Sequence, residues 1–133
     1  VGADAEAFGP LAAAYRMPKD TPEQLAAKQA AIQDALVGAT EVPLDIMRTA
    51  AACVEHADFL ARSGSRMARS DAGVSVAFAR AAVDGASLNV YINAASIDDA
   101  ERAARYRDEA DRLVAQTREH CDEVFAFVKD AVS

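Results

Sequence analysis

The chain has 133 residues, the length of one domain, and about a quarter of them are alanine. It is 52% hydrophobic but only 6% aromatic, which excludes an intrinsically disordered chain and argues against a β-sandwich. Its 14 lysines and arginines against 21 aspartates and glutamates leave a net charge of −7, so a nucleic acid is not an expected partner.

The sequence predicts helices throughout, because no segment alternates apolar and polar residues as a strand does. A capping box at Thr21 and Gln24, with Pro22 in the first helical position, marks one helix start. Pro43 has no N–H to donate to the Ala39 carbonyl, so we expect a kink there. The five expected helices are 4–16 with a kink or late start at Pro10, 21–43, 44–62, 70–94, and one from the capping signal at 96–99 to residue 132.

Five long helices joined by short turns predict an all-α antiparallel bundle, which forms a single domain over residues 1–133. Its many alanines allow close helix approach but offer little apolar area, so we expect a homodimer. No apolar run is long enough to span a bilayer, and no membrane partner is expected. Cys53 and Cys121 are too few for a disulfide framework, which favours packing roles and a reducing cytoplasm.

The helix expected over 70–94 has two polar faces. At about 100° per residue, Asn89 returns to the angle of Asp71, and Ser75 and Asn93 fall about 40° away. Alanines fill the rest of this narrow sector. The opposite face, which we expect to meet solvent, carries Arg80, Asp84, Ser87 and Tyr91.

Two interpretations of the narrow sector remain open. Asn89 and Asn93 lie one turn apart, roughly 6 Å along the axis, so one ligand can meet both. Asp71 is roughly 27 Å from Asn89 on the same helix, and a dimer with crossed or antiparallel helices would bring them together. Alternatively, the amides are buried and hydrogen-bonded to neighbouring helices, where they fix the register of the bundle.

Three arginines, Arg62, Arg66 and Arg69, cluster in the loop expected before residue 70. They either hold an anionic ligand tail or balance nearby carboxylates in solvent. His56 and His120 have no identifiable further ligands nearby in the sequence, so no metal site is expected. The aromatic residues predicted to lie in the core are Phe78, Phe125 and Phe127.

Several segments together resemble the folate cyclodeaminase/cyclohydrolase family, which includes formiminotetrahydrofolate cyclodeaminases and methenyltetrahydrofolate cyclohydrolases. The most specific match is the block Ser70–Ser75, Ala81-Ala82, Asp84–Ala86, Leu88–Val90 and Ile92-Asn93. Three further segments match in order: an acidic-Ala-Phe stretch at 4–8, a Pro-Lys turn at 18–23, and a helix leading to a Val-Pro at 31–43. The resemblance covers nearly the whole chain.

The resemblance implies an all-α fold, a homodimer and a tetrahydrofolate site in a helical cleft, with no metal or redox cofactor. On this basis Asp71 is expected to steady cationic charge, while Asn89 and Asn93 orient the pterin or polarise the one-carbon unit. The residues expected to bind substrate are Ser70, Ser75, Lys19, Arg66 and Arg69, with the basic ones at the glutamate tail.

The expected activity is cyclodeamination, which converts 5-formiminotetrahydrofolate to 5,10-methenyltetrahydrofolate and releases ammonia. The alternatives are methenyltetrahydrofolate cyclohydrolysis and a non-catalytic helical dimerisation or folate-binding module. Family members normally carry a Gly-Gly-Gly-Ser segment and further helices before the point that corresponds to Val1. We therefore expect the chain to be a fragment of a longer protein or a trimmed chain.

Overall fold

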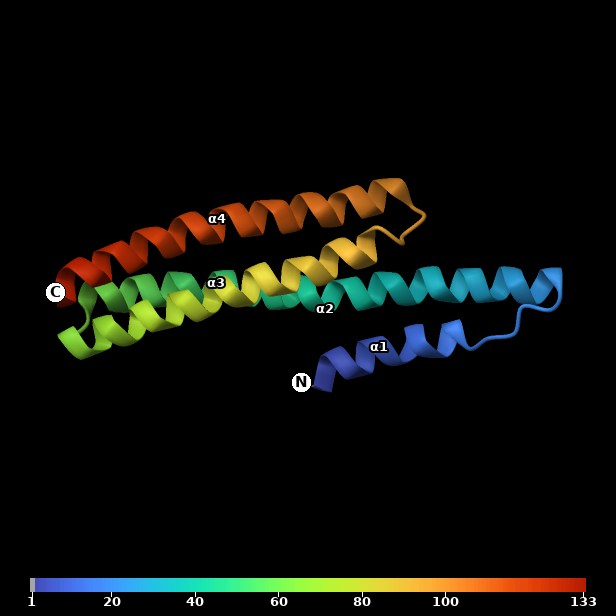
Figure 1. Cartoon of the computed structure of the whole chain (residues 1–133), viewed down its shortest axis with the longest axis horizontal. Helices are drawn as coiled ribbons and strands as arrows, with labels where there is room; N and C mark the ends of the chain where they lie inside the picture. Colours follow the sequence, from blue (N-terminus) through green and yellow to red (C-terminus); the bar gives the residue numbers. More distant parts are fainter. Residues whose placement is uncertain (1) are drawn as a thin grey trace.

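The computed structural model describes the backbone of residues 2–133 and all of their side chains except those of residues 3 and 4. The helices are α1 (Gly2–Tyr15), α2 (Pro22–Ser63), α3 (Arg66–Ala94) and α4 (Ala100–Val132). Consecutive helices run antiparallel (Figure 1). Residues 2–133 include no strand, so the predicted all-α antiparallel bundle is confirmed, whereas the predicted count of five helices is wrong.

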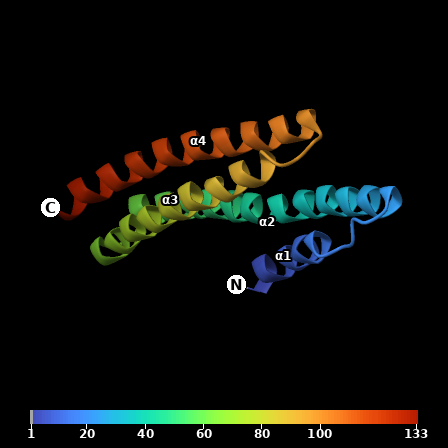
Figure 2. The same cartoon turned by 45° about the vertical axis from the view of Figure 1, so that its right-hand side comes forward.

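The bundle is arranged around α2, which is the longest helix. α3 lies along α2, and α4 packs mainly on α3 with a smaller contact to α2. α1 packs against the N-terminal half of α2 and makes no close backbone contact with α3 or α4 within residues 2–133 (Figures 1 and 2). α2 therefore separates α1 from the tightly packed α3 and α4.

The expected division of residues 21–62 into two helices is wrong, because α2 continues through Pro43. Pro43 is buried, and it leaves the Ala39 carbonyl without its usual partner in the helix. The side-chain amide of Asn93 on α3 donates to this carbonyl instead, with Nδ2 and O 3.3 Å apart. A contact between two helices thus replaces the bond that proline removes, and the chain stays helical.

Local capping fixes where two of the helices begin. The predicted capping box before α2 is confirmed, since the Thr21 hydroxyl accepts from the Gln24 N–H and the Gln24 side chain accepts from the Thr21 N–H. Asp99 caps α4 by accepting from the Arg102 N–H at 3.0 Å. The capping signal expected at 96–99 is therefore confirmed as well.

The start of α3 differs from the expected one. Ser65 occupies the N-cap position and accepts from the Ala68 N–H at 3.3 Å, so α3 begins at Arg66 rather than near Ser70. Arg66 and Arg69 therefore belong to the first turn of a helix and not to a loop. Because Arg66 lies at a helix N-terminus, its charge is not in the position that the helix dipole favours for a cation.

The core consists of two clusters of buried, mostly small side chains between α2, α3 and α4, and the larger cluster reaches α1 through Leu11. The prediction that Phe78 and Phe125 lie in the core is wrong, since they are 73% and 52% exposed. Alanine and valine fill the narrow space between the helices and leave the larger rings outside. Phe127 is half-buried, with the Arg62 guanidinium 4.9 Å from its ring centroid.

The face of α3 that was expected to meet solvent packs against α4 instead. Its polar contacts across the two helices are Arg80 with Asp122, Asp84 with Arg118 at 3.1 Å, and the Tyr91 hydroxyl with Asp111 at 2.5 Å. Ser87 is buried and donates to the Asp84 carbonyl of its own helix. Polar side chains therefore join α3 to α4 along this face.

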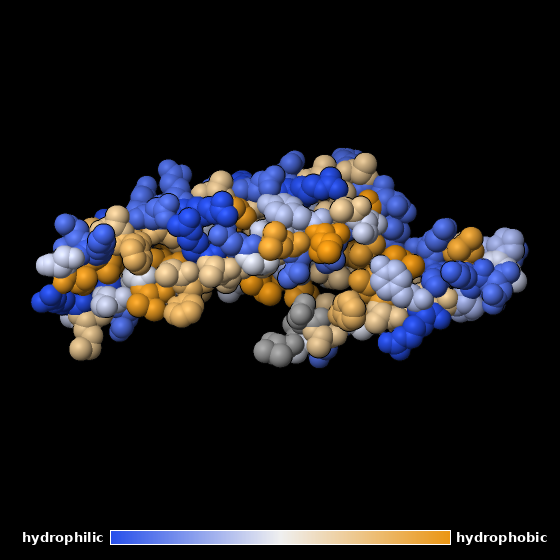
Figure 3. Space-filling model, in the orientation of Figure 1, coloured by the Kyte–Doolittle hydropathy of each residue, from blue (hydrophilic) through white to orange (hydrophobic). Residues whose placement is uncertain are grey.

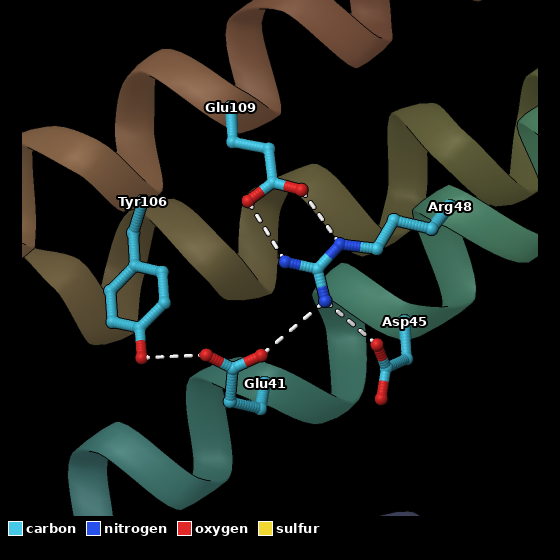
Figure 4. A network of polar contacts seen from close by, with 5 residues as sticks. All are labelled: Glu41, Asp45, Arg48, Tyr106 and Glu109. Carbon is cyan, nitrogen blue, oxygen red and sulfur yellow. Dashed lines mark hydrogen bonds and ion pairs between the residues drawn. The ribbon is translucent and has the colours of Figure 1, made fainter.

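A second polar network joins α2 to α4 (Figure 4). Arg48 donates from Nε and Nη2 to the two carboxylate oxygens of Glu109, at 2.6 and 2.9 Å. Its Nη1 donates to Asp45 at 2.8 Å and to Glu41 at 3.4 Å. Glu41 also accepts from the Tyr106 hydroxyl at 2.9 Å, and burial together with this carboxylate raises the pKa of Tyr106 to about 12. The two-pronged pair of Arg48 and Glu109 fixes how α2 and α4 are oriented.

Replacing Glu109 with glutamine should lower the free energy of unfolding at pH 7 by about 1 kcal/mol, since the Arg48 side chain is partly exposed and its charge is screened. The Arg48 guanidinium lowers the pKa of the Glu109 carboxyl, so this stabilisation is present above the unfolded pKa of about 4.3 and is lost as the pH falls through the folded value. Urea unfolding at pH 7 and near pH 2.5 measures both differences.

The matched control for this change is Glu101→Gln, which removes a carboxylate paired with Arg105 on the same helix. Glu101 is almost fully exposed, so the control should leave the stability nearly unchanged at both pH values. Equal losses in the two variants would contradict a role for the network in holding α2 against α4.

Candidate functional site

A groove with a volume of about 530 Å³ is lined by residues of α1, α2 and α3. Small-molecule sites typically have volumes of about 300–1,000 Å³. The groove has an apolar wall on α1, a floor on α2 and two amides on α3. The residues that define these three sides are Phe8 and Leu11, Ala39 and Pro43, and Asn89 and Asn93.

The orientation of Asn93 in this groove follows from Pro43. Because the proline frees the Ala39 carbonyl, Nδ2 of Asn93 has an acceptor on the groove floor. This bond turns the amide so that Oδ1 is the end left to accept a hydrogen bond from a ligand. Asn93 is half-buried, whereas Asn89, one turn earlier on α3, is exposed. The two amides thus present polar groups at one edge of an otherwise apolar groove.

Asp71 lies in a different place, at the other end of α3. It lines a separate pocket of about 320 Å³ between α2 and α3, together with Ser75, His56 and Cys53. Ser70 is exposed beside it. The structure therefore brings Asn89 and Asn93 together in one groove, and places Asp71, Ser70 and Ser75 outside that groove.

The three basic residues expected to bind an anionic tail do not share one site. Lys19 is exposed in the connection between α1 and α2, whereas Arg66 and Arg69 follow the opposite end of α2. The 42 residues of α2 make it roughly 60 Å long, so one ligand cannot meet both groups in a single chain. Arg66 donates from Nη2 to the Val132 carbonyl at 2.7 Å, and Nε of Arg69 is buried without a hydrogen-bond partner.

The expected packing role is confirmed for Cys121, which is buried, but is wrong for Cys53. Burial raises the pKa of the Cys121 thiol, which keeps it protonated, while Cys53 is exposed. His120 lies 2.9 Å from Asp58, which also accepts from Arg62 at 2.6 Å; these contacts lower the pKa of the Asp58 carboxyl.

Within the part of the chain that the structure describes, no three His, Cys, Asp or Glu side chains are grouped to hold a metal ion. None of the described helices is both long and apolar enough to cross a membrane.

The residues of the apolar wall were not among the predicted site residues, although Phe8 ends the acidic-Ala-Phe stretch at 4–8. Phe8 and Leu11 are three residues apart and therefore share one side of α1. That spacing was visible in the sequence, but it shows only that the helix has an apolar side. Which neighbour that side approaches depends on the packing of α1 on α2, which the sequence pattern does not reveal.

Comparisons with known proteins agree with the fold and with the sequence motifs. A methenyltetrahydrofolate cyclohydrolase from Methylorubrum extorquens is 38% identical over 130 residues, which cover 98% of this chain and 62% of that protein. A formimidoyltransferase-cyclodeaminase from Sus scrofa is 35% identical over 118 residues, covering 89% of this chain and 22% of that protein. The chain thus spans about three fifths or less of these relatives.

The fold itself has a solved counterpart. The crystal structure of formiminotetrahydrofolate cyclodeaminase from Thermotoga maritima matches with a TM-score of 0.69 at 22% identity, over 98% of this chain and 59% of that one. The sequence model of the Formiminotransferase-cyclodeaminase family matches residues 1–112. The resemblance inferred from the sequence motifs is therefore confirmed, and the chain belongs to the Formiminotransferase-cyclodeaminase family.

Proposed function

We propose that this chain forms the folate-binding helical part of an enzyme that converts 5-formiminotetrahydrofolate to 5,10-methenyltetrahydrofolate with release of ammonia. The groove between α1, α2 and α3 is the observation that carries this proposal, because it combines an apolar wall with two convergent amides. Membership of the family supports the choice of a folate. We also propose a homodimer in the cytoplasm that uses no metal or redox cofactor.

The reaction requires charge stabilisation and two proton transfers. N10 of the folate attacks the formimino carbon on N5, so a carbon–nitrogen bond forms there and the bond to the leaving nitrogen breaks. A base takes the N10 proton, and an acid protonates the nitrogen that departs as ammonia. Asn89 and Asn93 orient the pterin or polarise the one-carbon unit, with Oδ1 of Asn93 free to accept a hydrogen bond.

The remaining candidates act outside the groove of a single chain. Asp71 is proposed as the carboxylate that steadies cationic charge, with Ser70 and Ser75 as nearby substrate-binding groups. Lys19, or Arg66 and Arg69, meets the glutamate tail. These residues lie at opposite ends of α2, so only one of the two basic groups of the same chain can serve a ligand in its groove.

Cyclohydrolysis of methenyltetrahydrofolate is the second candidate function. It is favoured by the 38% identity to the Methylorubrum extorquens cyclohydrolase over nearly the whole chain. Water adds to the methenyl carbon and the bond to one ring nitrogen breaks, so the same amides would hold a related folate. A non-catalytic folate-binding or dimerisation module is the third possibility that the experiment must separate.

The test follows the absorbance of methenyltetrahydrofolate with the purified chain and with the full-length product of its gene. One cuvette starts with 5-formiminotetrahydrofolate and the other with methenyltetrahydrofolate. Faster appearance of the methenyl absorbance in the first supports cyclodeamination, and faster loss in the second supports cyclohydrolysis. No change in either cuvette with the full-length product contradicts both reactions and leaves the non-catalytic module.

Asp71→Asn should lower kcat by about a hundredfold in whichever reaction is found, because it removes a negative charge that steadies a cation. Asp71 is exposed and forms no side-chain hydrogen bond or ion pair within the described residues, so the stability should change little. Asp108→Asn, which removes an exposed carboxylate from α4, is the matched control and should keep full turnover. Unchanged turnover in Asp71→Asn would contradict the proposed role.

A further inference from the structure

One face of α3 is apolar and exposed along nearly the whole helix. Figure 3 shows apolar side chains along the front of the molecule, where α3 lies. Phe78, near the middle of α3, is 73% exposed. We call this face the α3 stripe, and its residues are Met67, Val74, Phe78, Ala81, Gly85, Leu88 and Ile92.

The residues of the α3 stripe are spaced like those of a helix that packs along a second helix. From Val74 to Ile92 its residues alternate steps of four and three, which is the 3.5-residue repeat of helices that pack along one another. Small residues occupy the centre, and a Cβ added at Gly85 would meet nothing within 4 Å in this chain. The open space at this position leaves room for a second helix to approach closely from outside.

The α3 stripe is also symmetric about its own centre, at the level of residue 83. If α3 is rotated by 180° about an axis that crosses it at that level, Val74 exchanges places with Ile92, Phe78 with Leu88, and Ala81 with Gly85. Large side chains then meet large ones at both ends, and small ones meet small ones in the middle. A surface that is complementary to itself in this way is the requirement for a two-fold interface between identical chains.

Charge also favours the antiparallel arrangement. Asp71 is the one charged residue on the edge of the stripe that carries Asn89 and Asn93, among the described residues of α3. Parallel pairing would place two Asp71 carboxylates at the same level, whereas antiparallel pairing places Asp71 near the level of the amide of Asn93. Two-fold symmetry about an axis perpendicular to both helices keeps this edge on the same side in each copy.

We propose that a second copy of this chain packs antiparallel on the α3 stripe and supplies its Asp71 to the groove that holds Asn89 and Asn93. Asp71 of the partner subunit comes to lie roughly 3 Å from the level of Asn93 and roughly 9 Å from that of Asn89 along the axis. Within one chain the separation from Asn89 is roughly 27 Å. The chemical role of this carboxylate rests on the proposed function, but the pairing itself does not.

The apolar surface is wider than the α3 stripe alone. Phe125 of α4 and Leu60 of α2 are both about half exposed and lie on either side of α3, next to Ala77 and Asp71. A stable interface typically buries about 800 Å² on each partner, which is more than the face of one helix supplies. These flanking side chains add to the area that a second copy would cover.

The first test measures mass in solution by light scattering, on the chain and on the full-length gene product. The chain should run at about twice its 14.0 kDa, and Phe78→Glu should shift it to the monomer mass. Phe59→Glu is the matched control, because Phe59 is equally exposed on α2 and lies outside the α3 stripe. A monomeric parent, or a dimer that Phe78→Glu leaves intact, overturns the proposal.

The second test checks the antiparallel register with a short bismaleimide in a Cys53→Ser background. Ala81→Cys should cross-link into covalent dimers, since the two copies of residue 81 lie roughly 6 Å apart along the axis. Val74→Cys should not, because its two copies lie roughly 27 Å apart. Cross-linking of both variants would indicate parallel pairing, and cross-linking of neither would indicate another interface; each overturns the proposal. This readout requires no activity.

The third test asks whether Asp71 and Asn93 of different subunits complete one site. Asp71→Asn and Asn93→Ala should each keep about a hundredth of the parent activity as pure dimers. Subunit exchange should give a mixture with about a quarter of the parent activity, because half the dimers are mixed and one of their two sites is intact. If the mixture stays as inactive as its components while the parent is active, the shared site is wrong. An inactive parent would instead contradict the proposed function.

Discussion

Replacing Asn93 with aspartate should lower kcat/KM by about a hundredfold, the size of effect seen when a single orienting amide is lost from a site. The change keeps the shape of the side chain but removes the N–H that reaches the Ala39 carbonyl. A carboxylate oxygen then faces a carbonyl oxygen across the same short distance and is repelled by it. The side chain turns away from the groove floor, and the acceptor that would meet the ligand moves with it.

The control for this variant is Gln33→Glu. Gln33 also links α2 to another part of the chain, the connection between α3 and α4, where it donates to the Ser96 carbonyl at 3.0 Å and accepts from the Asp98 N–H at 2.8 Å. The chemical change is the same, but Gln33 does not line the groove. Initial rates and urea unfolding on both variants should show a similar loss of stability, about 1 kcal/mol, with a loss of activity only in Asn93→Asp.

Pro43→Ala separates the loss of stability in Asn93→Asp from its loss of activity. Alanine at this position supplies a backbone N–H to the Ala39 carbonyl, so that carbonyl no longer depends on Asn93. In the Pro43→Ala background, Asn93→Asp should therefore cost less stability than it does alone, while the loss of activity remains. Equal stability costs in both backgrounds would show that the proline and the amide are not coupled.

Gly73→Val should lower the free energy of unfolding by about 3 kcal/mol, at the upper end of the usual cost of overpacking. A Cβ at Gly73 would already lie 2.8 Å from Cγ1 of Val128, so α3 and α4 cannot both keep their positions. Gly73 is buried, and the neighbouring atom belongs to a stiff β-branched side chain that has little freedom to move. Thermal unfolding should show a midpoint lower by about 10 °C.

Gly38→Val is the matched control, because Gly38 also lies inside a long helix but has open space where a Cβ would be. Removing a glycine there should leave the stability unchanged or raise it by about 0.5 kcal/mol. Adding Val128→Ala to Gly73→Val should restore part of the loss, since it removes the methyl groups that collide. A Gly73→Val protein as stable as its parent would contradict the close approach of α3 and α4.

The parts of the fold that the sequence predicted well are those that depend on residues close together in the chain. Thr21 and Gln24 cap each other within one turn, and Asp99 caps α4 in the same way. Pro43 misled the count of helices for the opposite reason. The partner that replaces its missing hydrogen bond is Asn93, which is 50 positions further along the chain and invisible to any local pattern.

In the candidate site, too, the sequence predicted what depends on neighbouring residues and missed what depends on distant ones. The angular position of Asn89 and Asn93 on one side of a helix follows from their spacing, and the structure places both at one groove. Spacing cannot say which apolar side chains are covered, because Phe78 and Val90 look equally suited to a core. Phe78 is exposed because it lies on the side of α3 that no other described helix covers, and which side is covered depends on how all the helices pack together.

The weak attachment of α1 gives the groove a movable wall. Within the described residues, α1 makes close backbone contact with α2 but not with α3 or α4, and its buried side chains are Leu11 and Ala14. Its end is held by the Lys28 ammonium, which donates to the Tyr15 carbonyl at 2.8 Å. Such an element detaches at a lower free energy than the rest of the bundle unfolds, so its amide hydrogens exchange through local opening. A ligand held between α1 and α3 stabilises the state in which α1 is attached to α2. Attachment of α1 strengthens ligand binding by the same free energy, so the two equilibria are linked.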